Sequence, residues 1–553
     1  MPQKPVYCRP PILNVPHCFP AAGTVRTSDD RIARLYEKAG KYKDHPCLWE
    51  GLFRIACLIS NKPADEPVAC MIREAIKENE TGAFSGTISD QICVARAAFS
   101  LFEYNTDRTI LKRIAEWLRY IEIESDHLFI TNDVLYRPAD LMELLVRFYQ
   151  ATGLKSVLRL CARLRADAFD WTTALHTFQQ TIPIGSEERS KPFTLPDKKP
   201  EIIDFDEKER LVNHAEILAD GVRYTLYAGL FSGHRMDLSA GKTVWGQLVR
   251  HHRALCGGTT GDPFLSGNAS DQPVNNLAVA AWTEAFGAQM TLSDFSWAAD
   301  EMIRIIRNGL DDCLNHDNAY RTQRINTICD NEENVSDQAA WYARMTRAVS
   351  TAYRCAVSLN ESGIRINYSM PGRYLVLSQK QSMILRMNEQ SVCFICKKPV
   401  STQIEIYVSP ITACSVRTVR SGQSASLFTF ENQQGHCIRT DAEWHDQDCI
   451  LFDPEERIFS EKTHHQGMAF MVSGHLLCMP SDPEGFSRAV CGNPGYDGEI
   501  ISVPTVHTDK WRIRENQPAD IPVLPESKDK PVQTQLKYYS GCPCRITMFP
   551  RAK

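Results

Sequence analysis

The chain has 553 residues, 43% of them hydrophobic and 23% charged, and is long enough for two or three folded domains. Its 62 basic and 67 acidic residues give a formal net charge of −5, which provides no electrostatic reason to expect a nucleic acid or an anionic membrane as partner. The amino terminus lacks a signal-peptide core, and no apolar run approaches the ~20 residues of a membrane span. We therefore expect a cytoplasmic protein whose 20 cysteines stay reduced.

Residues 1–358 are expected to form a helical domain. Apolar residues recur at the i, i+3, i+4, i+7 spacing of a half-buried helix over 141–148, and the same spacing returns over 302–313. Comparable stretches predict about ten to thirteen helices in antiparallel pairs. The segment 183–204 is rich in Pro, Lys, Glu and Ser and predicts a long exposed loop between helices.

Residues 359–553 are expected to form one or more β-sandwich domains. Apolar residues alternate with polar ones over 364–368 and again over 404–408, and short strands separated by Gly, Pro, Ser and Asn are typical of a sandwich. Cys393 and Cys396 have the spacing of a zinc knuckle, but no second ligand pair follows at a suitable distance. Core packing is the expected role of both cysteines.

A glycine turn at Cys256–Phe264 is the most distinctive motif. It reads Cys-Gly-Gly-Thr-Thr-Gly-Asp-Pro-Phe, and its glycines allow positive φ angles and a close approach of the backbone to a ligand. Asp262 is thereby presented on a loop. His214 begins an apolar helix upstream, where it could contact a ligand or be satisfied by a backbone carbonyl. The basic run Arg250–Arg253 could bind an anion, but a solvated helix end is the expected interpretation.

These motifs resemble the β-L-arabinofuranosidase family of glycoside hydrolases. Members pair an Asn-His-Ala or Gly-His-Ala helix start with a later Trp, a Thr-Gly-Gly turn and a Glu-Ala-Phe that carries the general acid/base. Here Asn213–Ala215, Trp245 and the glycine turn match in order, and Asp262–Phe264 falls where Glu-Ala-Phe would be. A literal Glu-Ala-Phe occurs at Glu284–Phe286, but it lies in an apolar helical run too far from the turn to match in register.

The resemblance extends over most of the chain. Residues 136–143 resemble the family's Tyr-x-x-x-His-Leu-x-Glu helix start, and 535–549 resemble its closing strands. It implies an (α/α)6 barrel followed by β-sandwich modules, with the inner helix ends forming a sugar pocket. The expected substrate-binding residues are His214, Tyr136, Asp140 and Trp245.

The family's zinc site has no counterpart here. Members hold zinc with one Glu and three Cys, one of which is also the nucleophile. The corresponding segments read Val-Asn-Asn-Leu-Ala-Val-Ala-Ala at 274–281 and Gln-Ala-Ala-Trp-Tyr-Ala-Arg at 338–344. Because neither supplies a thiolate, imidazole or carboxylate, we expect no metal and no cofactor.

Carboxylates are therefore the candidates for catalysis. Glycoside hydrolysis ordinarily needs one acid to protonate the leaving oxygen and a second carboxylate to attack or to activate water. Asp262 is the expected acid. Asp337 and Asp271 are candidates for the second role, although Asp337 could simply cap the following helix.

Three functions remain open at this point. The first is a glycosidase acting on a plant-type oligosaccharide or glycoside without zinc, and the second is a non-catalytic carbohydrate-binding protein on the same scaffold. The third, a polysaccharide lyase, would need a Tyr or His base and a group that neutralises a uronate. A homo-oligomer is left open as well.

Overall fold

The structure is a computed structural model. It describes residues 23–77, 82–128, 132–182, 193–261, 263–268, 273–292, 296–315, 323–324, 338–360, 363–377, 382–412, 414–419, 431–433, 437–454, 459–462, 467–480, 488–490, 499–501, 512–514, 517–523, 532–535, 537–538, 544–546 and 549–550. Everything stated below refers to these residues.

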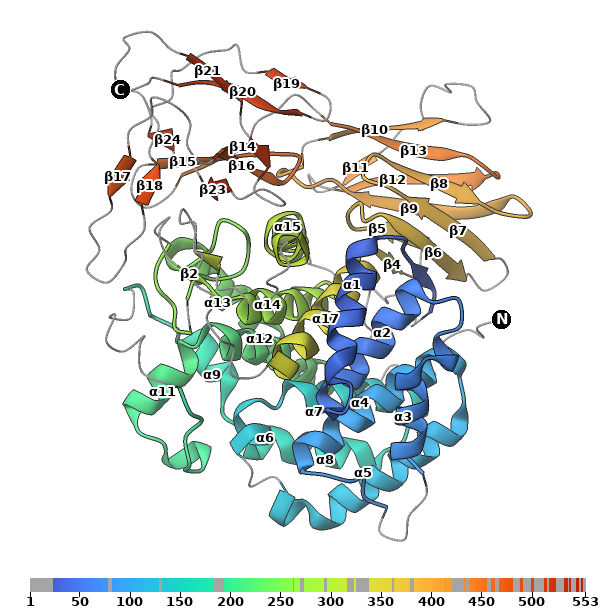
Figure 1. Cartoon of the computed structure of the whole chain (residues 1–553). Coiled ribbons are helices and arrows are strands. Elements are labelled where there is room, and N and C mark those ends of the chain that lie inside the picture. The colour runs from blue at the N-terminus through green and yellow to red at the C-terminus, as the bar shows by residue number, and fades with distance from the viewer. Residues whose placement is uncertain are drawn as a thin grey trace.

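Six helices form a closed ring in the amino-terminal part of the chain (Figure 1). Each contacts the next in chain order, and the last contacts the first. They are α2 (Trp49–Ile59), α4 (Ile88–Asn105), α7 (Ala139–Thr152), α12 (Ala215–Ser232), α14 (Asn276–Gln289) and α17 (Gln338–Cys355). Most residues of α12, α14 and α17 are buried on all sides, as expected for helices enclosed by others.

A second set of helices covers the ring from outside. These helices carry apolar residues on one face, and each contacts one or more ring helices. They are α1 (Asp30–Ala39), α3 (Pro67–Ala75), α5 (Arg108–Leu128), α8 (Ser156–Asp167), α9 (Trp171–His176), α11 (Phe205–Val212), α13 (Arg235–His251) and α15 (Ser296–Arg304). Shorter pieces are α6 (Asn132–Tyr136), α16 (Asp311–Asn315), the 3₁₀ turns η1 (Gly40–Tyr42), η2 (Pro46–Leu48), η3 (Pro63–Asp65) and η4 (Pro200–Ile202), and the π-helical turn η5 (Ile305–Leu310).

Local sequence signals set several helix ends. Thr87 and Asp90 form a reciprocal capping box before α4, and Asp204 caps α11 through the backbone N–H of Glu207. Gly153 and Gly233 end α7 and α12 in the left-handed conformation. The described part contains sixteen α-helices up to Cys355, more than predicted, because several are single turns that a periodicity count does not register.

The described strands after α17 contribute to a six-stranded and a five-stranded sheet, which we call the two larger sheets, to a further six-stranded sheet of shorter strands, and to several small sheets. One six-stranded sheet has the order β1 (Val25–Arg26), β6 (Gly372–Leu377), β7 (Ser382–Met387), β8 (Ser391–Ile395), β13 (Cys449–Pro454), β10 (Cys414–Val419). A five-stranded sheet has the order β11 (Glu431–Gln433), β12 (Cys437–Trp444), β9 (Val400–Tyr407), β5 (Gly363–Ile366), β4 (Val357–Leu359), and its β5–β9 pair is parallel.

Further strands complete the described carboxy-terminal part. A third sheet contains β14 (Phe459–Lys462), β15 (Gly467–Val472), β16 (His475–Pro480), β22 (Lys537–Tyr538), β23 (Cys544–Ile546) and β24 (Phe549–Pro550). Separate small sheets are formed by β17 (Arg488–Val490) with β18 (Glu499–Ile501) and by β19 (Arg512–Arg514), β20 (Gln517–Val523) and β21 (Val532–Gln535). Before α17, β2 (Pro273–Val274) pairs with β3 (Gln323–Arg324) as a two-stranded sheet.

The two larger sheets share buried side chains. The rings of Phe394 on β8 and Trp444 on β12 stack at 4.3 Å between centroids. Cys393 and Cys449 face each other across β8 and β13 as a disulfide, so the expectation that all cysteines are reduced does not hold for this pair. Cys396 is buried as expected and its thiol lies 3.7 Å from the carbonyl oxygen of Trp444.

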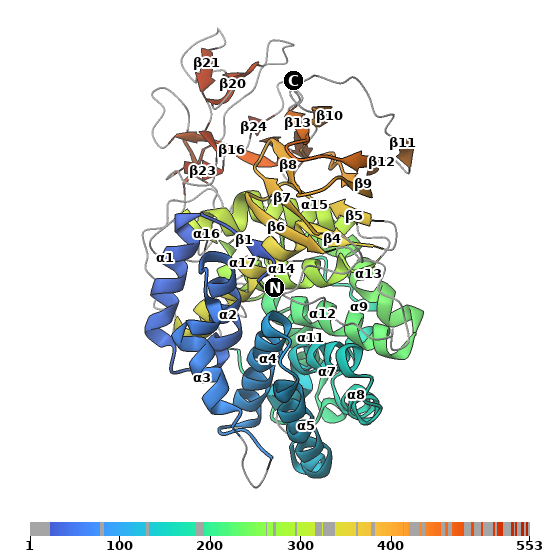
Figure 2. The same ribbon diagram turned by 90° about the vertical axis from the view of Figure 1, so that its right-hand side faces the viewer.

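The sheets lie together on one side of the helical part (Figures 1 and 2). The change from helices to strands occurs between Cys355, the end of α17, and Val357, the start of β4, close to the predicted point. The separation is not complete, because β1 pairs with β6 and so contributes two residues of the amino-terminal part to the first sheet. No helix among the described residues has an apolar stretch long enough to cross a membrane.

Candidate functional site

The glycine turn is anchored to the first turns of two ring helices. The backbone N–H of Ala215, the first residue of α12, donates to the carbonyl of Pro263 at 2.9 Å. The N–H of Asn275, which caps α14, donates to the carbonyl of Gly261 at 3.1 Å. Both neighbours of Asp262 are thus tied to the amino-terminal ends of ring helices.

The glycines of this turn have the conformations expected for them. Gly257, Gly258 and Gly261 have φ angles of 98°, 73° and 137°, which residues other than glycine rarely adopt. A Cβ at Gly261 would also lie 2.5 Å from the carbonyl oxygen of Phe264. Glycine is therefore required beside position 262 for two independent reasons.

The three predicted catalytic carboxylates, Asp262, Asp271 and Asp337, lie outside the described residues. Residues close to them in sequence lie at ring-helix ends. Val274, three positions after Asp271, forms a parallel bridge with Gly261, and Gln338, directly after Asp337, is the first residue of α17. The sequence neighbourhoods of Asp262 and Asp271 thus meet beside α14.

His214 caps α12 at the same end. Its Nδ1 accepts from the backbone N–H of Ile217 at 3.4 Å, and its ring contacts those of Phe193 and Phe264, with centroids 4.8 and 5.7 Å away. Burial lowers the pKa of His214 to about 4, so the ring is neutral near pH 7. Arg210 lies over the Phe264 ring, 5.3 Å from its centroid. His214 therefore sits in an aromatic cluster beside the glycine turn, with its Nδ1 used by the helix.

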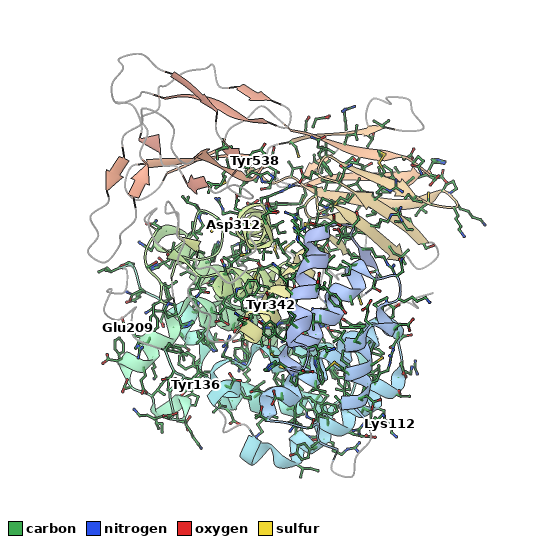
Figure 3. The ribbon with its side chains drawn as sticks, viewed as in Figure 1. Lys112, Tyr136, Glu209, Asp312, Tyr342 and Tyr538 are labelled. Carbon is green, nitrogen blue, oxygen red and sulfur yellow. A yellow bond between two sulfur atoms is a disulfide. The ribbon has the colours of Figure 1, made fainter. Side chains whose placement is uncertain are left out.

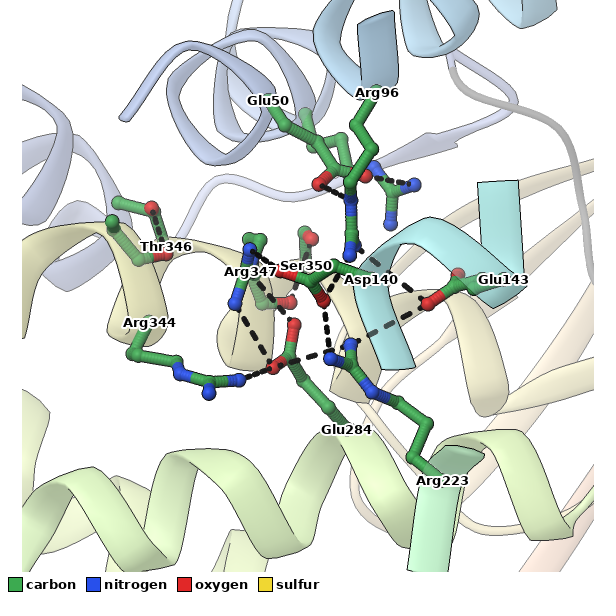
Figure 4. Close-up of polar contacts among 12 residues, drawn as sticks. Glu50, Arg96, Asp140, Glu143, Arg223, Glu284, Arg344, Thr346, Arg347 and Ser350 are labelled. Carbon is green, nitrogen blue, oxygen red and sulfur yellow. Dashed lines mark hydrogen bonds and ion pairs between the residues drawn. The ribbon is translucent and has the colours of Figure 1, made fainter. Parts of the chain in front are cut away.

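The centre of the ring holds a layer of ion pairs, which we call the charged layer (Figure 4). All six ring helices contribute to it, and each arginine pairs with at least one carboxylate. Its members are Glu50 and Arg54 of α2, Arg96 of α4, Asp140 and Glu143 of α7, Glu216, Asp220 and Arg223 of α12, Glu284 of α14, Arg344 and Arg347 of α17, and Arg137 before α7. Six carboxylates thus balance six guanidinium groups.

Asp140 and Arg137 are the members of the charged layer with the most exposed side chains. Their side chains are 27% and 29% exposed, whereas that of Asp220 is 3% exposed. Asp140 contacts Arg96 and Arg223, and its Oδ2 accepts from Arg347 at 3.1 Å. One predicted substrate-binding residue is thus the most accessible carboxylate of the layer.

The electrostatics of the charged layer exclude several of its carboxyls as proton donors near neutral pH. Burial alone would raise their pKa values, but the charges of the neighbouring arginines lower them below the ordinary range. The carboxyls concerned are Glu50, Asp140, Glu143, Glu216 and Asp220. A general acid needs a pKa near the working pH, so these five groups can bind and orient but not protonate a leaving group.

Two predicted substrate-binding residues are core residues instead. Tyr136 is fully buried, and its hydroxyl donates to the carbonyl of Lys198 at 2.6 Å (Figure 3). Trp245 is 4% exposed, and its ring packs on those of Trp282 and Phe286, both with centroids at 4.8 Å. Because apolar burial and a local hydrogen bond account for both rings, we assign them to packing.

The residues at the family's zinc positions do not fit a zinc site. The side-chain oxygen of Asn275 accepts from the N–H of Leu277 at 2.7 Å as a helix cap, and Val279 and Trp341 are buried apolar residues. Asparagine, aliphatic and indole groups are not zinc ligands. In the part of the chain that the structure describes, no three His, Cys, Asp or Glu side chains group closely enough to hold a metal ion.

The basic run near the glycine turn is structural as well. His252 is fully buried, its Nδ1 accepts from the N–H of Gly267 at 3.1 Å, and its Nε2 lies 2.9 Å from the carbonyl of Gln180. Arg253 pairs with Glu301 at 3.0 Å. The expectation of a solvated helix end is therefore wrong for His252.

Sequence reasoning missed most of the charged layer. Glu284 lies in an apolar helical run, yet its carboxylate accepts from Arg344 Nη1 at 2.8 Å and forms an ion pair with Arg347, whose Nε lies 2.9 Å away. The available signal was the position of Asp220 and Glu284 between apolar neighbours, where a solvated charge is not expected.

The fold is shared with solved glycoside hydrolases. One glycoside hydrolase superposes with a TM-score of 0.68 at 10% identity, covering 97% of this chain and 98% of that chain. A family 127 β-L-arabinofuranosidase from Geobacillus stearothermophilus T6 has a TM-score of 0.62 at 12% identity over 94% and 91%, and another family 127 β-arabinofuranosidase has 0.62 at 10% over 98% and 99%. No family profile and no curated protein matches the sequence. The resemblance inferred from the sequence is thus confirmed in the fold.

Proposed function

We propose that this protein is a glycoside hydrolase that acts on a plant-type oligosaccharide or glycoside by carboxylate chemistry, without zinc. The helical ring would be the inner layer of an (α/α)6 barrel, and the two larger sheets its β-sandwich. The observation that carries the proposal is the anchoring of both neighbours of Asp262 to the amino-terminal ends of α12 and α14.

Asp262 is the general acid in this proposal. The next residues after Pro263, Phe264 and Leu265, are apolar and fully buried. An acid role requires a carboxyl that holds its proton near neutral pH. The carboxyl protonates the oxygen of the departing group. Asp337 or Asp271 then supplies the second carboxylate, as nucleophile or as the base that activates water.

Substrate binding falls to Asp140 and His214. The ionised carboxylate of Asp140 can accept hydrogen bonds from sugar hydroxyls, and Arg137 beside it can donate. The aromatic cluster around His214 offers an apolar face to the sugar ring. Asp140 stays ionised, so in this proposal it binds the sugar but does not transfer a proton, which is the role of Asp262.

The charged layer argues against a polysaccharide lyase. Each of its arginines is already paired with a carboxylate, so a uronate substrate would have to displace an internal ion pair to be neutralised there. Breaking such buried pairs is costly. A neutral sugar carries no charge and can bind without displacing an ion pair.

The deciding experiment is Asp262→Asn assayed on aryl glycosides and plant oligosaccharides. We expect kcat to fall by ~10²-fold or more on natural glycosides and by less on nitrophenyl glycosides, whose leaving groups need no proton. Asp453→Asn, an exposed carboxylate on β13 paired only with Arg417 at the surface, serves as control. Unchanged turnover would move the acid role to Asp271 or Asp337, and binding without turnover of any substrate would favour the carbohydrate-binding alternative.

A further inference from the structure

A cavity lies where the helical part meets the sheets. Its volume is about 180 Å³, and it is enclosed by α1, η5, α16 and α17 on one side and by the segments before β6, before β8 and at the start of β16 on the other. Tyr353 in its wall lies fifteen positions after Gln338 on α17, which corresponds to ~22 Å at 1.5 Å per residue. The part of α17 that lines the cavity is therefore far from Gln338, whereas η5 in the same wall packs against the glycine turn, where a Cβ at Gly257 would lie 2.4 Å from the Ile305 side chain.

A π-helical turn builds one wall of this cavity. Within η5, the side-chain amide of Asn308 donates to the carbonyl of Gly474 at 3.0 Å, and its oxygen accepts from the N–H of Leu476 at 2.8 Å. These two bonds fix the turn between β15 and β16 and hold His475 beside Arg307. π-Helical turns are rare and occur frequently at functional sites.

The polar groups of the wall offer both donors and acceptors. Arg307 donates to Ser369 at 3.0 Å and to Glu389 at 3.1 Å, and its Nη1 lies 3.3 Å from the Nε2 of His475. Burial lowers the pKa of His475 to about 3, so the ring is neutral and accepts at Nε2. Its Nδ1 is buried and has no partner among the described residues. The ring stacks on Tyr538 at 4.7 Å (Figure 3).

The charges of the wall nearly cancel. Arg31 pairs with Asp29 and Asp311, and Arg307 pairs with Glu389. Two guanidinium groups thus meet three carboxylates, so an anion is not attracted. Glu389 is 62% exposed, whereas the side chain of Arg307 is 13% exposed. The remaining wall is apolar and includes Ile306, Leu310, Val349, Ala352, Met370 and Pro371.

We propose that this cavity is a second carbohydrate site that binds a neutral monosaccharide or a terminal sugar residue. A cavity of about 180 Å³ has room for a small ligand such as a single sugar ring. Paired guanidinium and carboxylate groups suit vicinal hydroxyls, which donate and accept at once, and the apolar wall suits the C–H face of the ring. The site does not depend on the catalytic role of Asp262.

Isothermal titration of the full-length protein with arabinose, xylose and glucose tests this site. Arg307→Met keeps the aliphatic length of the side chain but removes its charged donors, and we expect it to weaken sugar binding at this site by ~10-fold or more. Glu389→Gln, an exposed position that tolerates change, should weaken it to a smaller extent. Arg417→Met is the matched control, because Arg417 is an arginine of the sheets paired only at the surface.

The two sugar sites are separated by their variants. His214→Asn, at the other end of the ring, should leave the Arg307-dependent binding intact, and Arg307→Met should leave kcat on glycosides unchanged. The proposal is wrong if Arg307→Met binds all three sugars as tightly as Arg417→Met. It is also wrong if none of these sugars binds outside the glycine-turn site, or if inorganic phosphate binds at the cavity in their place.

Discussion

Replacing Glu284 by Gln tests the charged layer most directly. The carboxylate is 5% exposed and lies within 2.9 Å of Arg344 and Arg347 and 3.6 Å from Arg223. Glutamine has nearly the same shape but no charge, and its amide nitrogen would face a guanidinium donor. The variant therefore leaves three buried arginines short of one counter-charge.

The expected decrease in the free energy of unfolding follows from the loss of this counter-charge. Removing one partner from a buried ion pair costs about 3–5 kcal/mol, because the remaining charge stays desolvated. An exposed pair contributes only about 0–1 kcal/mol. Asp453→Asn breaks such a pair, since Arg417 and Asp453 are 54% and 42% exposed. We therefore expect Glu284→Gln to lower the free energy of unfolding by several times as much as Asp453→Asn.

Urea unfolding at pH 7, followed by tryptophan fluorescence, measures both variants in one assay. The double variant Glu284→Met/Arg344→Met should lose less stability than the sum of its single variants, since residues in one ion network are coupled by about 0.5–3 kcal/mol. If Glu284→Gln unfolds at the same urea concentration as Asp453→Asn, the layer is not a tightly coupled network, and our exclusion of its carboxyls as proton donors loses its basis.

Three further outcomes are expected. The pKa of His214 is about 4 in the folded protein and 6.5 ordinarily, so the free energy of unfolding should fall by up to ~3 kcal/mol as the pH drops from 6.5 to 4. His214→Asn keeps a capping oxygen but does not titrate, and urea titrations at several pH values should show a smaller fall for this variant. Gly261→Ala should lower the free energy of unfolding by about 1–3 kcal/mol and reduce kcat. In the control Gly246→Ala on α13, the added Cβ meets nothing within 4 Å, so calorimetry should show unchanged or increased stability. Tyr136→Phe should lower stability by about 1 kcal/mol and leave KM unchanged; a raised KM would restore Tyr136 as a substrate contact.

The sequence predicted those features that depend on local pattern. The change of apolar period from 3.6 to 2 placed the end of the helices within a few residues of Cys355, because periodicity reports which face of an element is buried. The three glycines of the turn predicted positive φ angles, because only glycine adopts them without strain.

Features that depend on long-range packing could not be predicted in the same way. Asp220 and Arg344 are 124 positions apart and meet only because the ring closes, and a single sequence gives no sign of that contact. Trp245 is a substrate-binding candidate through the family resemblance alone, whereas its burial depends on Trp282 and Phe286 of a different helix.

The pairing of β1 with β6 sets the order in which the protein can be completed during synthesis. Val25 lies opposite Tyr374, 349 positions later, and α17 closes the helical ring only after residue 355 has been made. At about 5–20 residues per second, the first strand waits roughly 17–70 s on the ribosome for its partner. Until α17 has been made its contacts with α2 are missing and the ring of helices stays open, so we expect nascent chains halted before residue 338 to be digested by protease faster than chains that include α17.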